Sequence, residues 1–282
     1  MKTVSRIQTL QKILAPLRGK KKVGLVPTMG ALHEGHLSLI RRAKRECGCV
    51  VVSLFVNPLQ FGPKEDFKTY PRDLPGDRKK AASAGADLLW APSVEEMFPP
   101  GHQTFVEVEG VGRRWEGASR PGHFRGVATV VAKLFQIVRP DRVYLGQKDY
   151  QQTRVILRMV RDLAFDLSVR ICPTLREKDG LAMSSRNQRL SAEERKAAPV
   201  LYKALRNGEA LIREGERESR RVIQRMEEVI RSEARAKIDY IALADPETLE
   251  PIDRIAGRVV LLGGVKIGAV RLIDNLVMNI HE

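Results

Sequence analysis

The chain has 282 residues, of which 43% are hydrophobic and 29% are charged, so it can bury one large core or two ordinary ones. No apolar run approaches the roughly 18–20 residues that cross a bilayer, which excludes a membrane-spanning helical protein. The net charge of +15 permits nucleic-acid binding, but only 5% of residues are aromatic, so few rings are available for base stacking.

The N-terminus and the cysteines indicate the compartment. Residues 1–6 carry charges with no apolar stretch after them, so we predict no signal peptide and, by elimination, a cytoplasmic protein. The three cysteines, Cys47, Cys49 and Cys172, match neither a disulfide framework nor a metal-binding pair. We therefore expect ordinary thiols in a reducing compartment.

Strand and helix patterns alternate through the first two-thirds of the chain. This alternation predicts an α/β domain whose mainly parallel sheet is covered by helices on both faces. Such sheets bind ligands beyond the carboxyl ends of their strands. The expected strands are 23–26, 50–56, 87–90, 105–108, 143–145 and 167–171, and the expected helices are 37–46, 75–84, 127–138 and 150–163.

The pattern changes after Cys172 and Pro173, so we predict one domain over residues 1–174 and a smaller α+β domain over residues 175–282. A capping box at 191–194 predicts a helix as far as about Leu205. A charged helix should follow over 219–236. Short strands are expected at 240–243, 259–262 and 269–272, with Gly263-Gly264 joining two of them.

Two of the five histidines, His33 and His36, lie three residues apart in a glycine-containing turn after the first apolar strand. A helix that begins at such a turn directs backbone N–H groups and the positive end of its dipole at an anion. Two imidazoles there indicate a phosphate-bearing substrate. The alternative is an ordinary helix start with two surface histidines, but for a pair at a glycine-rich turn we favour a functional site.

Gln60 lies just beyond the buried strand 50–56, in the segment 55–62. Its amide offers a donor and an acceptor to a ligand. Taken alone, an Asn-Pro turn with a solvent-facing glutamine is the simpler interpretation.

Lys148 and Asp149 lie where the strand 143–145 gives way to a helix. A lysine at such a turn is a mobile positive charge for phosphate, and the alternative is a surface Lys–Asp pair. Asp149 could cap the helix, orient Lys148 or meet a metal. Gln152 lies one helical turn further on and can face the same crevice.

Two polar loops remain. The segment 180–187 contains Ser184 and Arg186, whose hydroxyl and guanidinium groups can gather phosphate oxygens, although an ordinary polar loop is the alternative. The basic, glycine-rich segment 113–126 could be a lid over the site or a disordered connection. The sequence leaves both interpretations open.

Taken together, these segments resemble the pantothenate synthetase (pantoate–β-alanine ligase) family. They occur in the family's order, which makes the set far more specific than any one motif. One departure is Gln147, where the resemblance leads us to expect an acidic or small residue. The matching segments are 27–36, 55–61, 70–72, 120–127, 146–152 and 183–187, and the tail 271–275 also resembles the family's end.

The resemblance implies a Rossmann-like first domain that binds nucleotide and pantoate, a C-terminal domain that acts as a lid, and a homodimer formed through the first domains. It implies the ATP-dependent condensation of D-pantoate with β-alanine to pantothenate through pantoyl adenylate, with release of AMP and pyrophosphate. ATP, D-pantoate and β-alanine would be its small-molecule partners, with neither nucleic acid nor membrane. The histidine turn and the loop 183–186 are similar to the paired ATP signatures of the nucleotidyltransferase superfamily.

The same resemblance assigns roles to residues. His36, His33 and Lys148 would be catalytic, with His36 the stronger candidate for proton donor, and Gln60 and Gln152 would bind pantoate, Gln60 also near the incoming amine. Mg²⁺ would be carried chiefly by ATP oxygens, with Asp149 the nearest side chain. Backbone groups around Met29, Gly146 and Leu175 would hold the nucleoside. The full ATP-binding set is Met29, Gly30, Ala31, Leu32, His33, Glu34, Gly35, His36, Gly146, Gln147, Lys148, Asp149, Leu175, Met183, Ser184, Ser185 and Arg186.

Two other classes of protein remain as alternatives. Another adenylyl-transferring enzyme would need the histidine turn but neither Gln60 nor Gln152. A basic nucleic-acid-binding protein would need a clustered basic face and would bind with a steep salt dependence. We rank the second alternative last, because the polar motifs fall at expected strand ends and not on one helix face.

Overall fold

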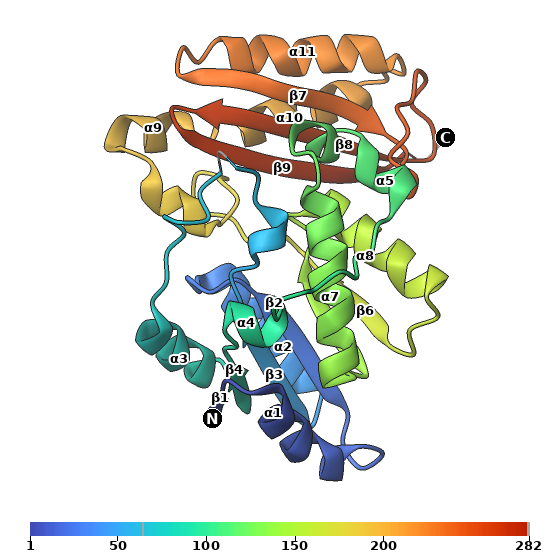
Figure 1. Cartoon of the computed structure of the whole chain (residues 1–282). Helices are drawn as coiled ribbons and strands as arrows, with labels where there is room; N and C mark the ends of the chain where they lie inside the picture. Colours follow the sequence, from blue (N-terminus) through green and yellow to red (C-terminus); the bar gives the residue numbers. More distant parts are fainter. Residues whose placement is uncertain (64, 281–282) are drawn as a thin grey trace. The chain divides into compact units, whose positions relative to one another are not determined.

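The computed structural model describes residues 1–63 and 65–280 and divides the chain into two compact units, each built around its own sheet (Figure 1). The first unit comprises residues 1–112, 120–146 and 155–173. The second comprises residues 113–119, 147–154 and 174–282. The two units are therefore not two continuous halves of the chain, because the short segments 113–119 and 147–154 belong to the second unit.

Within the described residues, the sheet of the first unit has six parallel strands in the order β1-β4-β3-β2-β5-β6. From β2 the chain moves one way across the sheet to β3 and β4, and it then returns to place β5 and β6 on the other side of β2. The order therefore reverses between β2 and β5, which is the topological switch point where parallel sheets bind ligands. The strands are β1 (Lys2–Val4), β2 (Val23–Thr28), β3 (Cys49–Leu54), β4 (Leu88–Trp90), β5 (Arg142–Gly146) and β6 (Ser168–Cys172).

Helices cover both faces of this sheet, which confirms the predicted α/β class. In β3, Val51 packs into the core formed with α1, α7 and α8, whereas Val50 and Val52 pack into the core beneath α2 and α3. Successive side chains of a strand point to opposite faces, so a strand covered on both faces must be apolar throughout. These helices are α1 (Ile7–Leu14), α2 (Glu34–Glu46), α3 (Leu74–Ser83), α7 (His123–Val138) and α8 (Tyr150–Asp162).

The predicted strand at 105–108 is wrong. The Val106 N–H donates to the Thr129 hydroxyl of α7 at 2.9 Å and thus pairs with a helix side chain. The alternating pattern was right about burial, since Val106 and Val108 pack against the core beside α7. The segment 113–126 is not one long loop, because short helices occupy part of it. The short helices of the chain are η1 (Ala15–Leu17), η2 (Pro58–Gln60), α4 (Val94–Met97), α5 (Glu109–Arg113), α6 (Glu116–Ser119) and η3 (Ser185–Arg189).

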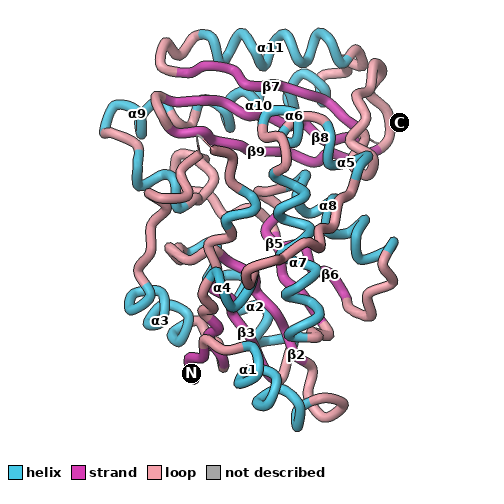
Figure 2. The backbone as a smooth tube through the Cα atoms, viewed as in Figure 1, coloured by secondary structure: helices cyan, strands magenta, loops and turns pink. Residues whose placement is uncertain are grey.

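The second unit has an antiparallel sheet in the order β7-β8-β9, with α10 and α11 packed against it (Figure 2). Its apolar core lies between these two helices and the sheet. This is the α+β arrangement predicted from the sequence. The elements are α9 (Ala192–Ala197), α10 (Val200–Arg213), α11 (Ser219–Arg231), β7 (Ala236–Ala244), β8 (Arg258–Ile267) and β9 (Val270–Asn279).

Two details of this unit differ from prediction. Gly263 and Gly264 do not join strands but lie inside β8, where a Cβ on Gly263 would meet the Leu201 side chain at 2.6 Å. Glycine is needed there because α10 packs closely on the sheet; the hairpin turn is at Gly268, with φ +56°. The helix expected from residue 192 to Leu205 is two helices, since Pro199 separates α9 from α10.

The three cysteines are free and buried. Among the residues that the structure describes, no helix is long and apolar enough to cross a membrane.

Candidate active site

The histidine turn connects the end of β2 to the start of α2. The hydroxyl of Thr28, the last residue of β2, donates to the Ser53 carbonyl of β3 at 2.8 Å and accepts the Gly30 N–H at 3.3 Å. Gly30 and Ala31 have φ values of +88° and +50°. Glycine adopts this left-handed conformation readily, but alanine does so only where neighbouring contacts impose it. The turn is therefore held by the surrounding structure.

Those contacts come from α3. Asp77, which is 2% exposed, accepts the N–H groups of Ala31 at 2.8 Å and Leu32 at 2.7 Å. Lys80, one helical turn later, donates to the Leu32 carbonyl at 2.8 Å. Burial raises the pKa of the Asp77 carboxyl, although the two backbone donors and Lys80 oppose this effect. Two N–H groups of the turn are thus engaged by a side chain that lies outside every motif found in the sequence.

The two histidines cap their own helix reciprocally. His33 is the N-cap residue of α2, and its Nδ1 accepts the Gly35 N–H at 3.2 Å. The Nδ1 of His36 accepts the His33 N–H at 3.4 Å, and the two ring centroids lie 4.1 Å apart. Since each Nδ1 is an acceptor, each neutral ring must carry its proton on Nε2. Both histidines are therefore set up as Nε2–H donors, which is the hydrogen-bonding role that a phosphate oxygen requires.

Gln60 follows the neighbouring strand β3 and is 9% exposed, so the interpretation of a solvent-facing glutamine is wrong. Its Nε2 lies 3.1 Å from the sulfur of Met29, which follows β2. Its Oε1 accepts from Asn57 Nδ2 at 3.1 Å, and Asn57 also donates to the Gly126 carbonyl at 3.0 Å. The ends of two adjacent strands and the helix α7 thus meet at Gln60.

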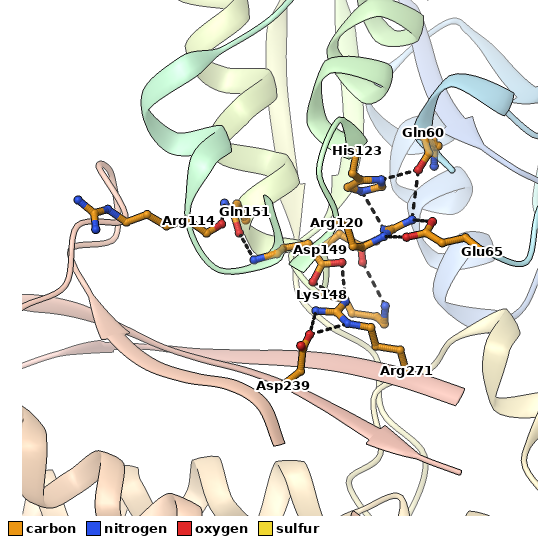
Figure 3. A network of polar contacts seen from close by, with 11 residues as sticks. Gln60, Glu65, Arg114, Arg120, His123, Lys148, Asp149, Gln151, Asp239 and Arg271 are labelled. Atoms are coloured by element: carbon orange, nitrogen blue, oxygen red, sulfur yellow. Dashed lines mark hydrogen bonds and ion pairs between the residues drawn. The ribbon is translucent and has the colours of Figure 1, made fainter. Parts of the chain in front are cut away.

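Arg120 and His123 hold the backbone of Gln60 (Figure 3). Arg120 binds both oxygens of Glu65, at 2.7 and 2.5 Å, and donates to the Gln60 carbonyl at 3.2 Å. His123 accepts from Arg120 on Nε2 at 3.0 Å and donates from Nδ1 to the same carbonyl at 2.8 Å. Burial alone would raise the pKa of Glu65, but the hydrogen bonds and charge of Arg120 outweigh it, and the pKa is lowered. This anchor lies in a segment that carried the resemblance, although the sequence assigned it no role.

Lys148, in the second unit, has its Nζ 3.1 Å from Asp149 Oδ1 (Figure 3). Of the three roles left open for Asp149, this contact supports the orientation of Lys148. The carbonyls of Gln147 and Lys148 both accept from Asn275 Nδ2 of β9, each at 2.9 Å. Gln152 is half-buried in the first turn of α8.

The loop from Leu175 to Arg186 also belongs to the second unit. The Met183 N–H donates to the Leu175 carbonyl at 2.9 Å, so the loop closes on itself. The Ser184 hydroxyl accepts the Arg186 N–H at 3.3 Å and thereby caps η3. Because a hydroxyl that accepts can still donate, this capping role is compatible with phosphate binding.

The predicted site residues therefore form two sets. The first unit brings together Met29, the turn 30–36 and Gln60, and the second contains the residues at 147–152 and 175–186. Within the first unit, β2 and β5 are paired neighbours, and β2 leads into the histidine turn. Among residues 1–63 and 65–280, no group of three or more His, Cys, Asp or Glu side chains could hold a metal ion.

This fold and site define a class: α/β enzymes with paired histidines at the switch point of a parallel sheet. Comparison with known proteins defines the family. The family model for pantoate-beta-alanine ligase matches residues 2–277. The pantothenate synthetase of Moorella thermoacetica is 53% identical over 283 residues, covering 100% of both chains. The crystal structure of the Thermus thermophilus pantothenate synthetase matches with a TM-score of 0.94 at 51% identity, over 98% of this chain and 99% of that one.

A pantoate-beta-alanine ligase from Francisella tularensis, solved in complex with beta-gamma ATP and β-alanine, matches with a TM-score of 0.81 at 37% identity, over 98% of this chain and 97% of that one. The chain belongs to the pantoate–β-alanine ligase family, whose members condense pantoate with β-alanine at the expense of ATP.

Proposed function

We propose that this chain forms pantothenate in two steps, through pantoyl adenylate. The carboxylate of D-pantoate attacks the α-phosphorus of ATP, so that an acyl–phosphate bond forms and pyrophosphate leaves. The amine of β-alanine then attacks the acyl carbon and loses a proton, and AMP leaves. The observation that carries the proposal is the reciprocal histidine cap, which directs the Nδ1 atoms of His33 and His36 to the backbone. Their Nε2–H groups can then donate hydrogen bonds to the phosphate oxygens that gain charge as pyrophosphate leaves.

In this proposal Lys148, Ser184 and Arg186 bind the phosphates together with the two histidines. Lys148 contributes a mobile charge, and Arg186 a planar group that can bind two oxygens at once. Backbone groups around Met29, Gly146 and Leu175 hold the nucleoside. The amides of Gln60 and Gln152 bind pantoate by hydrogen bonds.

Mg²⁺, carried by ATP oxygens, would offset the charge of the phosphates. The Asp149 carboxylate is of the ligand type that Mg²⁺ prefers and is 46% exposed, so it fits this role beside Lys148. We further propose residues 1–174 as the nucleotide- and pantoate-binding domain, residues 175–282 as a lid domain, a homodimer formed through the first domains, and a cytoplasmic location, which the buried free thiols support.

The test is a substrate panel scored for the nucleotide product. We expect ATP to be split to AMP and pyrophosphate only when pantoate is present, and pantothenate to appear only when β-alanine is added. Release of ADP and phosphate would contradict the adenylate mechanism. Pyrophosphate release without pantoate would favour another adenylyl-transferring enzyme.

A further inference from the structure

Asn275 is a buried amide whose hydrogen bonds converge on the backbone around Lys148. It is 2% exposed and lies in β9. Its Nδ2 donates to the carbonyls of Gln147 and Lys148, each at 2.9 Å, and its Oδ1 accepts from Gln147 Nε2 at 3.3 Å. An amide nitrogen has two hydrogens, so both donors of Asn275 are used on this turn.

The two carbonyls belong to the peptide groups immediately before and after the Cα of Lys148. Fixing both peptide planes fixes the two backbone dihedrals between them. Those dihedrals set the direction in which the Lys148 side chain leaves the backbone. Asn275 therefore controls the orientation of a side chain that it does not need to touch.

The residue before it, Asp274, links the same point of β9 to the loop from Leu175 to Arg186. Asp274 is 5% exposed and forms a two-pronged ion pair with Arg176, at 2.5 and 3.0 Å. Its Oδ1 also accepts the Asn275 N–H at 2.8 Å. Arg176 in turn donates to the Gly180 carbonyl at 3.0 Å and lies over the Tyr202 ring, 4.0 Å from its centroid. The Asp274 carboxylate is thus buried against a half-buried guanidinium, and both partners make further hydrogen bonds that compensate for their lost hydration.

We propose that Asn275 is a positioning residue for Lys148, and that Asp274 and Asn275 together hold the Lys148 turn and the loop 175–183 in one fixed arrangement. This inference rests on the proposed function, because it assumes that Lys148 binds phosphate. It gives Asp274 and Asn275 a structural role, whereas the sequence placed them only in a segment that carries the resemblance.

The experiment is a double-mutant cycle on pyrophosphate release with saturating ATP and pantoate. A residue that acts only through Lys148 loses its effect once Lys148 is absent. We expect Asn275→Ala to lower kcat on the order of 10- to 100-fold, because a donor displaced by about 1 Å costs about that much. Lys148→Ala should cost on the order of 10²–10³-fold. The double variant should be no slower than Lys148→Ala alone.

Two further variants separate positioning from folding. Asn275→Asp has the same shape but presents no donor to the two carbonyls, so it should be at least as slow as Asn275→Ala, and its effect should also vanish without Lys148. Asn207→Ala is the matched control, since the Asn207 amide of α10 donates to the Lys203 carbonyl at 2.9 Å in an exposed setting. Its kcat should stay within about twofold of the unmodified enzyme.

The inference is overturned if Asn275→Ala slows the Lys148→Ala enzyme by the same factor as it slows the unmodified one, or if it leaves kcat unchanged. Failure of the proposed function gives different results. In that case the unmodified enzyme shows no pantoate-dependent pyrophosphate release, or Lys148→Ala turns over normally.

Discussion

Asp77 accepts the N–H of Leu32 at 2.7 Å from a position 45 residues further along the chain. The carboxylate also accepts the Ala31 N–H, so one buried side chain of α3 holds a turn that contains two residues with left-handed backbone. The start of α2, and with it both histidines, follows directly from this turn. The positions of the proposed phosphate donors therefore depend on a side chain outside every recognised motif.

The first prediction is that Asp77→Ala lowers both stability and adenylation rate. Two buried N–H groups would lose their acceptor, which costs about 1–3 kcal/mol per unsatisfied group. Urea unfolding gives the stability, and pyrophosphate release gives the rate. Asp162→Ala is the control, since Asp162 forms an exposed pair with Arg158 and should change stability by at most about 1 kcal/mol. Equal unfolding free energies for the two variants would contradict the prediction.

The second prediction concerns the pH dependence of that contribution. Burial raises the pKa of Asp77 above its unfolded value of about 3.9, so the folded state binds this proton more tightly. Its contribution to stability is then fully present below about pH 3.9 and is lost as the pH rises through the raised pKa. The unfolding free energy of the unmodified protein minus that of Asp77→Asn should therefore fall as the pH increases from about 4. A difference that grows with pH would disprove the assigned direction.

The third prediction is that the contribution of Glu65 to stability depends on pH in the opposite direction. Burial acts to raise its pKa, but Arg120 outweighs this effect and the pKa is lowered. Its contribution is present above the unfolded value of about 4.3 and is lost as the pH falls through the lower folded pKa. The unfolding free energy of the unmodified protein minus that of Glu65→Gln should accordingly shrink as the pH is lowered below about 4.3. The same urea titrations test both carboxyls, and parallel curves would refute one of the two assignments.

The fourth prediction concerns the separate roles of Nδ1 and Nε2 of His36. An asparagine amide can replace Nδ1 and accept the His33 N–H, but it does not reach the position of Nε2. We expect His36→Asn to keep the helix cap and to lose on the order of 10²–10³ in adenylation rate. His36→Ala should lose that rate and also about 0.5–1.5 kcal/mol of stability, because the His33 N–H loses its acceptor while the cap of His33 on Gly35 remains. Thermal unfolding and pyrophosphate release measure the two effects, and a fully active His36→Asn would remove Nε2 from the mechanism.

The sequence was sufficient to predict the parallel sheet, because β3 and its neighbours are apolar on both faces and short polar turns separate them from helices. Prediction from local sequence pattern failed where a segment packs against an element that is distant in the sequence. At Val106 the alternation was real, but the segment lies against α7 and not beside a strand. At position 263 a glycine is needed because the Leu201 side chain of α10 lies too close for a Cβ. This requirement depends on how α10 packs on the sheet and has no local sequence signature.

The same distinction applies to the candidate site: residues with a local sequence signature could be named in advance, and residues defined by a distant contact could not. His33, His36, Gln60 and Lys148 were named as candidates because each follows an apolar strand, and their roles stay predictions. Asp77 could not be named, because a carboxylate within a charged helix is ordinarily a solvent-facing residue. Asn275 lay in a matching segment, but its contact with the Lys148 backbone joins positions 127 residues apart and has no local signature.

The last prediction concerns the pantoate end of the site. Gln60 and Gln152 are uncharged, so they should recognise the hydroxyls and carboxylate of pantoate by hydrogen bonds. A site built from such groups discriminates strongly against analogues that lack a hydroxyl, because its own polar groups are then left unpaired. Gln60→Ala and Gln152→Ala should therefore weaken pantoate use far more than ATP binding.

Two measurements on each variant test this separation: isothermal titration with ATP alone, and steady-state kinetics in which pantoate is varied. For Gln60 the test is demanding, because its amide also contacts Met29 and Asn57, at 3.1 Å each. Asn57→Ala serves as the comparison, since it removes the support of Gln60 but leaves its amide in place, and it should cause a smaller loss in pantoate use than Gln60→Ala. If ATP binding and pantoate use fall by equal factors in Gln60→Ala, the side chain shapes the crevice as a whole and does not select pantoate.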